Sequence, residues 1–335
     1  MKLVSSVPLD EGQRARLDTA LPGIEIVTSD SFLNDEVGEL VDADTGIVYA
    51  FRLPGDLLHR APNLRWVQLL GAGCDHLFGT PLMRSDIPIT TASGVHATPI
   101  AEYVLGVILG HYRWLPQSYR AQMHREWLSQ MDVARGSREL RNRTIAIIGY
   151  GSIGREVARL AKPFGTRILA VKRDPAIKEE RGYTIEGTGD PRGELPDAFY
   201  GFDRIHEVLS ESDVVVLAVP MTPETDKMIG VAEFDAMRKG SYLVNIARGE
   251  VIDERALMNA LANGPMAGAA LDVFNEEPLP ADSPLWGFEN AVITPHISGA
   301  SRPHLRRTFE ILAENLERFA QNRPLLNRVD PVKGY

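Results

Sequence analysis

The chain has 335 residues, of which 44% are hydrophobic and 24% charged, the composition of a folded rather than a disordered protein. Its 45 acidic side chains outnumber its 36 Lys and Arg side chains, and the net charge of −9 argues against a broad nucleic-acid-binding face. The length exceeds what one hydrophobic core usually supports, so we expect two domains. The one cysteine, Cys74, excludes an intramolecular disulfide and argues against a cysteine-based zinc site, so no metal centre is expected.

The sequence favours a cytoplasmic protein. Its first residues, MKLVSSVPLDEGQR, become polar too early for a signal peptide, and the most apolar stretch, 104–109, is too short to span a membrane. A single cysteine also fits a reducing compartment. Neither nucleic acid nor a membrane is therefore expected as a partner.

Short β-branched and apolar runs alternate with helical stretches along the chain. The clearest predicted strands are 24–27, 47–50, 66–70, 144–148, 168–171, 214–219, 242–246 and 291–294. Several are apolar throughout, which is typical of strands buried on both faces in a parallel sheet covered by helices. The alternation predicts an α/β fold.

The predicted strands fall into two sets, separated by a helical region over 99–128. Pro99 suits a first helical turn, and Thr98 before it is a candidate cap. Residues 174–203 are rich in glycine and proline and are expected to form an extended surface loop. A last helix is predicted over 302–321, where apolar side chains recur at helical spacing.

A glycine fingerprint follows the predicted strand 144–148. Gly149, Gly151 and Gly154 form GxGxxG between a strand and a helix. The first glycine permits a tight turn, the second lets the backbone approach a pyrophosphate, and the third lets helix and strand pack closely. The N–H groups at the start of the helix are then available to the anion. In this context we favour dinucleotide binding over a merely glycine-rich turn.

The end of the next strand bears on which dinucleotide binds. NAD sites usually carry an acidic residue about 20 positions past the glycines, at the ribose 2′-hydroxyl. Here Lys172 and Arg173 stand in that region and could neutralise a 2′-phosphate, which favours NADP over NAD. If both cations only face solvent, Asp174 would fill the usual acidic role.

Three later segments place polar groups at or just beyond the ends of strands, where open α/β sheets bind ligands. Arg248 ends a buried strand, Asp272 and Glu277 lie within 268–278, and His296 follows a proline. Taken one at a time, each has an ordinary explanation. Arg248 could be a surface cation, Asp272 and Glu277 could be turn or loop residues, and His296 could be a structural histidine. Their joint occurrence downstream of a dinucleotide fingerprint indicates a catalytic site.

These motifs resemble those of the D-isomer-specific 2-hydroxyacid dehydrogenases, and among them the glyoxylate and hydroxypyruvate reductases. The matching segments are 149–154, 219–225 (VPMTPET), 245–249 (NIARG), 271–278 (LDVFNEEP) and 294–299 (TPHISG), with weaker matches at 71–76 and 101–102. The resemblance covers nearly the whole chain. Lys172 and Arg173 stand where the family most often has an acidic residue. This departure leaves the preference for NAD open, but it does not affect the expected fold.

The resemblance implies two doubly wound parallel-sheet domains, Rossmann-like or flavodoxin-like, with the active site in the cleft between them. Residues 1–101 and 297–335 would form the substrate domain, and 102–296 the NAD(P)-binding Rossmann domain. Because the family is usually dimeric through the Rossmann domain, we expect a homodimer. Its interface would include residues 111–136, with Trp114 and Trp127, unless these aromatic rings are simply buried within the subunit.

The family's catalytic trio corresponds to Arg248, Glu277 and His296. Arg248 would bind the carboxylate of a 2-oxo acid and polarise the adjacent carbonyl. His296 would donate a proton to the alkoxide formed when hydride reaches C2, and would act as the base in reverse. Glu277 would hold the imidazole in one orientation. The implied reaction is hydride transfer between NAD(P)H and a small 2-oxo acid such as glyoxylate or hydroxypyruvate.

The resemblance also implies the remaining binding residues. Backbone N–H groups around Ala72 and Gly73 would bind the substrate carboxylate. Asp272 would lie near the nicotinamide amide, and Gly299 would complete the ring pocket. The other cofactor contacts are expected at Thr98, Ser152, Ile153, Val219, Pro220 and Ala247.

Two other interpretations stay open. D-lactate, phosphoglycerate and phosphite dehydrogenases use the same scaffold, and the sequence does not reveal which group at C2 is preferred. A different class is a dinucleotide-sensing scaffold of the corepressor type, which binds the dinucleotide and recruits partners. Retention of the three catalytic residue types favours an enzyme.

Overall fold

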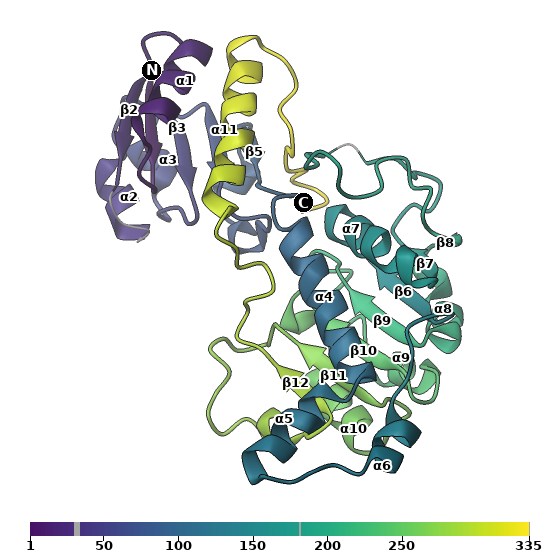
Figure 1. Ribbon diagram of the computed structural model, residues 1–335. Helices are drawn as coiled ribbons and strands as arrows, with labels where there is room; N and C mark the ends of the chain where they lie inside the picture. Colours follow the sequence, from purple (N-terminus) through teal and green to yellow (C-terminus); the bar gives the residue numbers. More distant parts are fainter. Residues whose placement is uncertain (30–33, 181, 335) are drawn as a thin grey trace. The chain divides into compact units, whose positions relative to one another are not determined.

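The computed structural model describes residues 1–29, 34–180 and 182–334 (Figure 1). Within these residues, no helix combines the length and the apolar character needed to cross a membrane.

The chain forms two compact units. The first contains Met1–Val95 and Ser301–Tyr335, and the second contains His96–Ala300. The predicted dinucleotide domain, 102–296, therefore falls wholly within the second unit.

The first unit is built on a five-stranded parallel sheet in the order β2-β1-β3-β4-β5. Its elements are β1 (Lys2–Ser5), α1 (Glu11–Ala20), β2 (Glu25–Thr28), α2 (Asn34–Leu40), β3 (Thr45–Ala50), α3 (Leu57–Arg60), β4 (Trp66–Leu69), β5 (Ile89–Thr90) and α11 (His304–Ala320). Side chains of α1 and α11 pack on one face of the sheet, and those of α2 and α3 on the other. In Figure 1 α11, in yellow, lies beside the purple strands although it is last in the chain.

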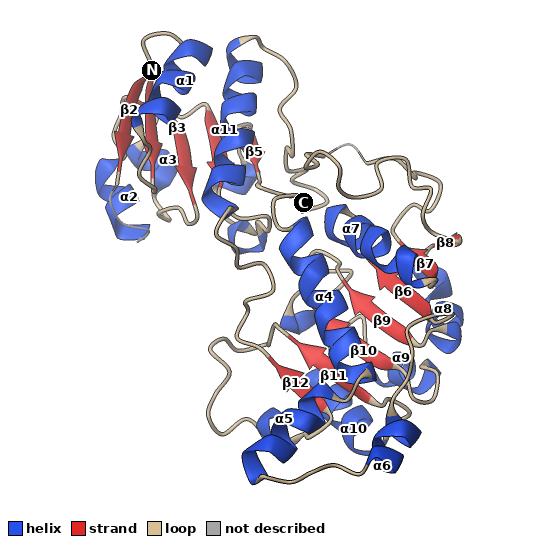
Figure 2. Ribbon diagram, viewed as in Figure 1, coloured by secondary structure: helices blue, strands red, loops and turns tan. Residues whose placement is uncertain are grey.

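The second unit contains a seven-stranded parallel sheet in the order β12-β11-β10-β9-β6-β7-β8. Its elements are α4 (Ala97–Tyr112), α5 (Leu115–His124), α6 (Gln130–Gly136), β6 (Thr144–Ile148), α7 (Ser152–Ala161), β7 (Arg167–Val171), β8 (Ala198–Tyr200), α8 (Ile205–Glu211), β9 (Val214–Leu217), α9 (Val231–Ala236), β10 (Tyr242–Asn245), α10 (Glu254–Asn263), β11 (Gly268–Leu271) and β12 (Ala291–Ile293). Helices α4 and α7 cover one face of this sheet, and α8, α9 and α10 the other (Figure 2). The predicted doubly wound α/β class is confirmed.

The central strand β6 shows why the sequence runs apolar without alternation. Ile145 and Ile147 pack under α4 and α7, whereas Ala146 and Ile148 pack on the opposite face with α8 and α9. β6 is flanked by β7 on one side and β9 on the other, so the chain order reverses at this strand. Open α/β sheets bind ligands at such a switch point, outside the carboxyl ends of the strands.

The helical region predicted over 99–128 is present, but it is not one continuous helix. It is two helices, because α4 ends at Tyr112 and α5 begins at Leu115, with Trp114 between them at φ 59°. Pro116 accounts for the break, since proline has no N–H to donate to the carbonyl of Tyr112. The proposed cap is wrong. Helix α4 begins at Ala97, so Thr98 lies inside its first turn.

The predicted loop 174–203 needs a smaller correction. Most of it lacks regular structure, but β8 extends the sheet by pairing with β7. Strands β1 and β5 were not predicted either.

Candidate active site

The glycine fingerprint lies at the carboxyl end of β6, as predicted. Gly149 has φ 103°, and a Cβ there would lie 2.5 Å from the carbonyl carbon of Ala218. A Cβ on Gly154 would lie 2.4 Å from the carbonyl oxygen of Gly149. At Gly151, by contrast, a Cβ would meet nothing within 4 Å. The turn is therefore closed at its first and third glycines and open at the second, as a pyrophosphate requires.

The other expected cofactor residues lie around this turn or at strand ends on the same edge of the sheet. Ser152 and Ile153 open α7, where the N–H groups of a first helical turn have no partner within the helix. Val219 and Pro220 follow β9, and Ala247 follows β10. These placements fit a dinucleotide.

Thr98 and Gly299 lie near the start of α4. The hydroxyl oxygen of Thr98 is shielded from solvent and has no hydrogen-bond partner among the described residues. A buried hydroxyl normally has a hydrogen-bond partner, and a bound ligand could supply the partner that the Thr98 hydroxyl lacks. The carbonyl oxygen of Gly299 lies 3.1 Å from Nδ1 of His96, the residue before α4.

Lys172 and Arg173 differ in their surroundings. The Lys172 ammonium donates to the carbonyl of Ile177, and burial lowers the pKa of Lys172. The Arg173 guanidinium is more exposed and forms an ion pair with Glu224 at 3.2 Å. Asp174 accepts a hydrogen bond from the N–H of Ala176 at 2.9 Å and so shapes the following turn. Arg173 is thus the more accessible of the two cations.

Arg155 was not identified from the sequence, although it follows the fingerprint directly. Its side chain is 2% exposed and donates to Glu180 Oε2 at 3.0 Å and to the carbonyls of Lys178 and Asp190 at 2.6 and 2.5 Å. The Tyr150 hydroxyl, inside the fingerprint, donates to Asp190 Oδ2 at 2.7 Å. These bonds attach the loop after Lys172 to α7 and its turn. Only the charge of Arg155 on an otherwise buried helix face could have signalled this role.

His296 and Glu277 form a direct pair. His296 Nδ1 lies 2.7 Å from Glu277 Oε2, and the side chains are 49% and 34% exposed. Glu277 Oε1 accepts the N–H of Phe274 at 2.9 Å, which fixes the carboxylate. With an ionised carboxylate as acceptor, Nδ1 carries the hydrogen, and Nε2 is the nitrogen left for proton exchange with a ligand.

Arg248 follows β10 in the same unit. Its Nη1 donates to the carbonyl of Ala247 at 2.8 Å, and its own carbonyl accepts from Asn245 Nδ2 at 3.0 Å. A Cβ on Gly249 would lie 2.0 Å from the carbonyl carbon of Phe274. The backbone after Arg248 therefore touches the segment that leads to Glu277, which only glycine permits.

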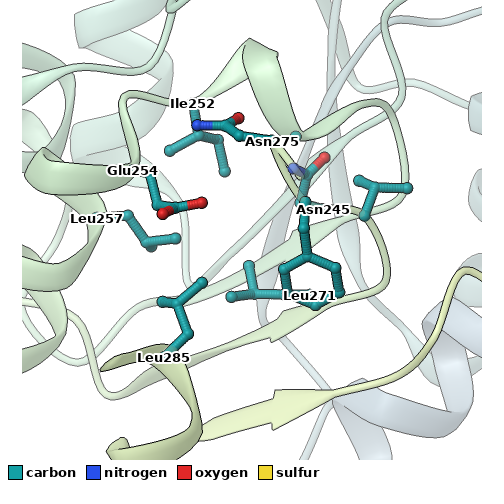
Figure 3. Close-up of a pocket in the computed structure, with 10 residues that line it drawn as sticks. Asn245, Ile252, Glu254, Leu257, Leu271, Asn275 and Leu285 are labelled. Carbon is teal, nitrogen blue, oxygen red and sulfur yellow. The ribbon is translucent and has the colours of Figure 1, made fainter. Parts of the chain in front are cut away.

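A small pocket lies beside this contact (Figure 3). Its lining includes Asn245, Gly249, Asn275 and Leu285, and most of the lining side chains are apolar. The described lining residues do not include Arg248, Glu277 or His296. We therefore interpret it as a packing gap behind the segments that carry Arg248 and Glu277.

Asp272 holds the segment that carries His296. Its fully buried carboxylate accepts from Thr294 Oγ1 at 2.6 Å and from the N–H groups of Ile297 and Ser298 at 2.9 and 2.8 Å. This anchoring was not foreseen. The expected contact of Asp272 with a nicotinamide amide stays a prediction.

The predicted substrate residues Ala72 and Gly73 lie in the first unit, half-buried in the loop after β4. Among the described residues there is no group of three or more His, Cys, Asp or Glu side chains placed to hold a metal ion.

The fold and this site together define a dinucleotide-dependent dehydrogenase of the α/β class. Residues 105–298 match the family model described as the NAD binding domain of D-isomer specific 2-hydroxyacid dehydrogenases. The chain belongs to the D-isomer specific 2-hydroxyacid dehydrogenase family, and its cofactor is a nicotinamide dinucleotide.

Individual relatives agree with this assignment. The chain is 34% identical to a glyoxylate reductase from Aeropyrum pernix over 83% of this chain and 80% of the relative. A solved D-isomer specific 2-hydroxyacid dehydrogenase from Xanthobacter autotrophicus, in complex with NADPH and MES, has 29% identity and a TM-score of 0.79, covering 100% of this chain and 99% of the other. An NADPH-dependent glyoxylate/hydroxypyruvate reductase from Sinorhizobium meliloti, in complex with NADP and sulfate, has 25% identity and a TM-score of 0.79 at the same coverage.

Proposed function

We propose that the protein transfers hydride between a nicotinamide dinucleotide and C2 of a small 2-oxo or 2-hydroxy acid, of the glyoxylate or hydroxypyruvate kind. The main support is the His296–Glu277 pair at 2.7 Å, with the Arg248 segment packed against the segment leading to Glu277. All three residues belong to the unit that carries the dinucleotide fingerprint. Relatives named for reduction of glyoxylate or hydroxypyruvate support the substrate class.

In this proposal each residue has one task. A bound reduced nicotinamide supplies the hydride. The Arg248 guanidinium binds the substrate carboxylate and polarises the neighbouring carbonyl, with N–H groups of Ala72 and Gly73 as further donors. As C2 gains the hydride, the electron pair of the C=O bond moves to oxygen. The His296 ring, which must enter this step protonated on both nitrogens, donates its Nε2 proton there and is left with the hydrogen on Nδ1. Glu277 keeps Nδ1 occupied, so the ring presents Nε2. In the reverse direction His296 accepts the proton.

The test is a substrate panel with its matched catalytic variant. NADPH oxidation is followed by absorbance with glyoxylate, hydroxypyruvate and pyruvate, for the wild type and for His296→Ala. We expect turnover of at least one acid by the wild type, and loss of kcat with retained NADPH affinity in the variant. Tight NADPH binding without turnover of any 2-oxo acid would contradict the proposal and favour a dinucleotide-sensing scaffold.

The proposal includes a preference for NADP. Lys172 and Arg173 lie at the end of β7, where they could neutralise a 2′-phosphate, and Arg173 is exposed enough to reach one. Two solved relatives contain NADPH or NADP. The measurement is kcat/KM with NADPH against NADH, and equal values would contradict the preference.

The proposal also includes a homodimer, and the cytoplasmic location expected from composition. Large apolar side chains are strongly exposed on one arm of the second unit: Leu115 at 46%, Tyr119 at 66%, Met123 at 82%, Trp127 at 93% and Met131 at 62%. Such a set favours a protein interface. Trp114 is different, because its ring packs against Gly136 within the subunit. Light scattering should report a dimer that Trp127→Ala weakens; a monomeric wild type would contradict this part.

A further inference from the structure

A line of three side chains leads from helix α4 to the segment carrying His296. The Tyr103 hydroxyl, on α4, lies 2.7 Å from Thr294 Oγ1, which in turn donates to Asp272 Oδ1 at 2.6 Å. A threonine hydroxyl has one hydrogen to donate, and Thr294 donates it in the hydrogen bond to Asp272. Tyr103 must therefore be the donor to Thr294. Burial raises the pKa of Tyr103 to about 12, so its hydroxyl stays protonated at neutral pH.

The same carboxylate holds the backbone on both sides of the segment. Besides Thr294, Asp272 accepts from the N–H groups of Ile297 and Ser298. The Asp272 carbonyl also accepts the N–H of His296 at 2.9 Å. Asp272 is fully buried, and a buried charge is stable only when its partners are all in place.

The backbone of His296 needs this support. Its φ is 53°, in the left-handed region that residues with a Cβ seldom adopt. Such a conformation persists only where the surrounding structure over-determines it. The bonds to Asp272 flank His296 on both sides, at Thr294 and at Ile297. Loss of one of them would free the ring to leave its position against Glu277.

We propose that Tyr103 and Thr294 are positioning residues, which hold His296 in place for proton transfer. Thr294 donates directly to Asp272, and Tyr103 orients the Thr294 hydroxyl by donating to it. Neither is assigned a contact with substrate or cofactor. The inference rests on the proposed function for its kinetic consequence, since it assumes that His296 transfers the proton.

The experiment compares Thr294→Val, Thr294→Ser and Tyr103→Phe. The control is Tyr49→Phe, which removes a similar buried tyrosine–threonine bond, 2.8 Å to Thr308, in the other unit. Measurements are kcat, KM for the 2-oxo acid, the Kd of NADPH, the solvent deuterium isotope effect on kcat, and Tm.

For Thr294→Val and Tyr103→Phe we expect kcat to fall about 10- to 100-fold. The Kd of NADPH should stay within about two-fold, and the solvent isotope effect should rise because proton transfer becomes slower. Thr294→Ser should restore most of kcat. Tyr49→Phe should lower Tm without this loss. A merely structural role would lower Tm in all variants and leave the isotope effect unchanged.

The proposal is overturned if Thr294→Val and Tyr103→Phe behave like Tyr49→Phe, or if kcat and NADPH affinity fall together. If the wild type reduces no 2-oxo acid, the proposed function fails separately. Positioning is then judged by amide hydrogen exchange over 294–299. Faster exchange in Thr294→Val but not in Thr294→Ser supports it, and equal exchange in the two variants refutes it.

Discussion

Replacing Gly151 by alanine should separate cofactor binding from folding. Gly151 has φ −91°, which alanine adopts readily, and a Cβ there would meet nothing within 4 Å. The cost to folding should stay below about 1 kcal/mol, from the weaker N-cap of α7. The new methyl group would, however, occupy the space through which a pyrophosphate approaches the N-terminus of α7.

The magnitude follows from the hydrogen bonds at stake. Displacing the pyrophosphate should lose one charge-assisted hydrogen bond, worth about 1.5–3 kcal/mol. This corresponds to an increase in the Kd of NADPH of about 10- to 150-fold. The assay is calorimetric titration with NADPH, together with thermal denaturation of the same ligand-free protein. We expect weak binding with a Tm within about 4 °C of the wild type.

Gly154→Ala is the matched control, because its Cβ would lie 2.4 Å from the carbonyl oxygen of Gly149. Overpacking of this kind costs about 1–3 kcal/mol and should lower Tm by about 2–12 °C. The reasoning is refuted if Gly151→Ala binds NADPH as tightly as the wild type. It is equally refuted if Gly154→Ala keeps the wild-type Tm.

Three further predictions concern charge. Replacing both Lys172 and Arg173 by alanine should weaken the binding of NADPH far more than the binding of NADH. Most of this loss should already be present in the Arg173→Ala variant, because the Lys172 ammonium donates to the Ile177 carbonyl. The measurement is kcat/KM with each cofactor. Arg155→Met should lower the free energy of unfolding in urea by about 3–5 kcal/mol, since it leaves buried acceptors without a donor. Burial lowers the pKa of His111 to about 4. As the pH falls, the unfolded chain therefore takes up a proton at His111 before the folded chain does. The free energy of unfolding should fall by about 2 kcal/mol between pH 6.5 and 4.

Each of these predictions has its own contrary result. Equal losses with NADPH and NADH would show that the cations at the end of β7 do not bind a 2′-phosphate. An Arg155→Met variant of wild-type stability would mean that its hydrogen bonds contribute nothing net. For His111 the control is His111→Phe, which keeps a ring against Tyr242 but cannot titrate. An unchanged acid sensitivity in that variant would rule out His111 as its source.

The parts that could be predicted from the sequence are those that depend on neighbouring residues. The TIAII run and the glycines after it predict a buried strand, a tight turn and a helix, because each depends on local backbone freedom and on burial of one short segment. The pairing of Glu277 with His296 was expected only through the family resemblance. The structure gives that pair its distance, 2.7 Å.

The hydrogen bonds between segments far apart in the chain were decided only by the tertiary structure. Nothing near Asp272 indicates that it will bind Thr294, Ile297 and Ser298, because that contact exists only once β11 and β12 pair in register. Arg155 likewise finds its acceptors in a loop that shows no hydrophobic period of its own. Local pattern specifies which segment becomes a strand or a helix. Which side chains meet depends on sheet order and register, and these are set by packing of the whole unit.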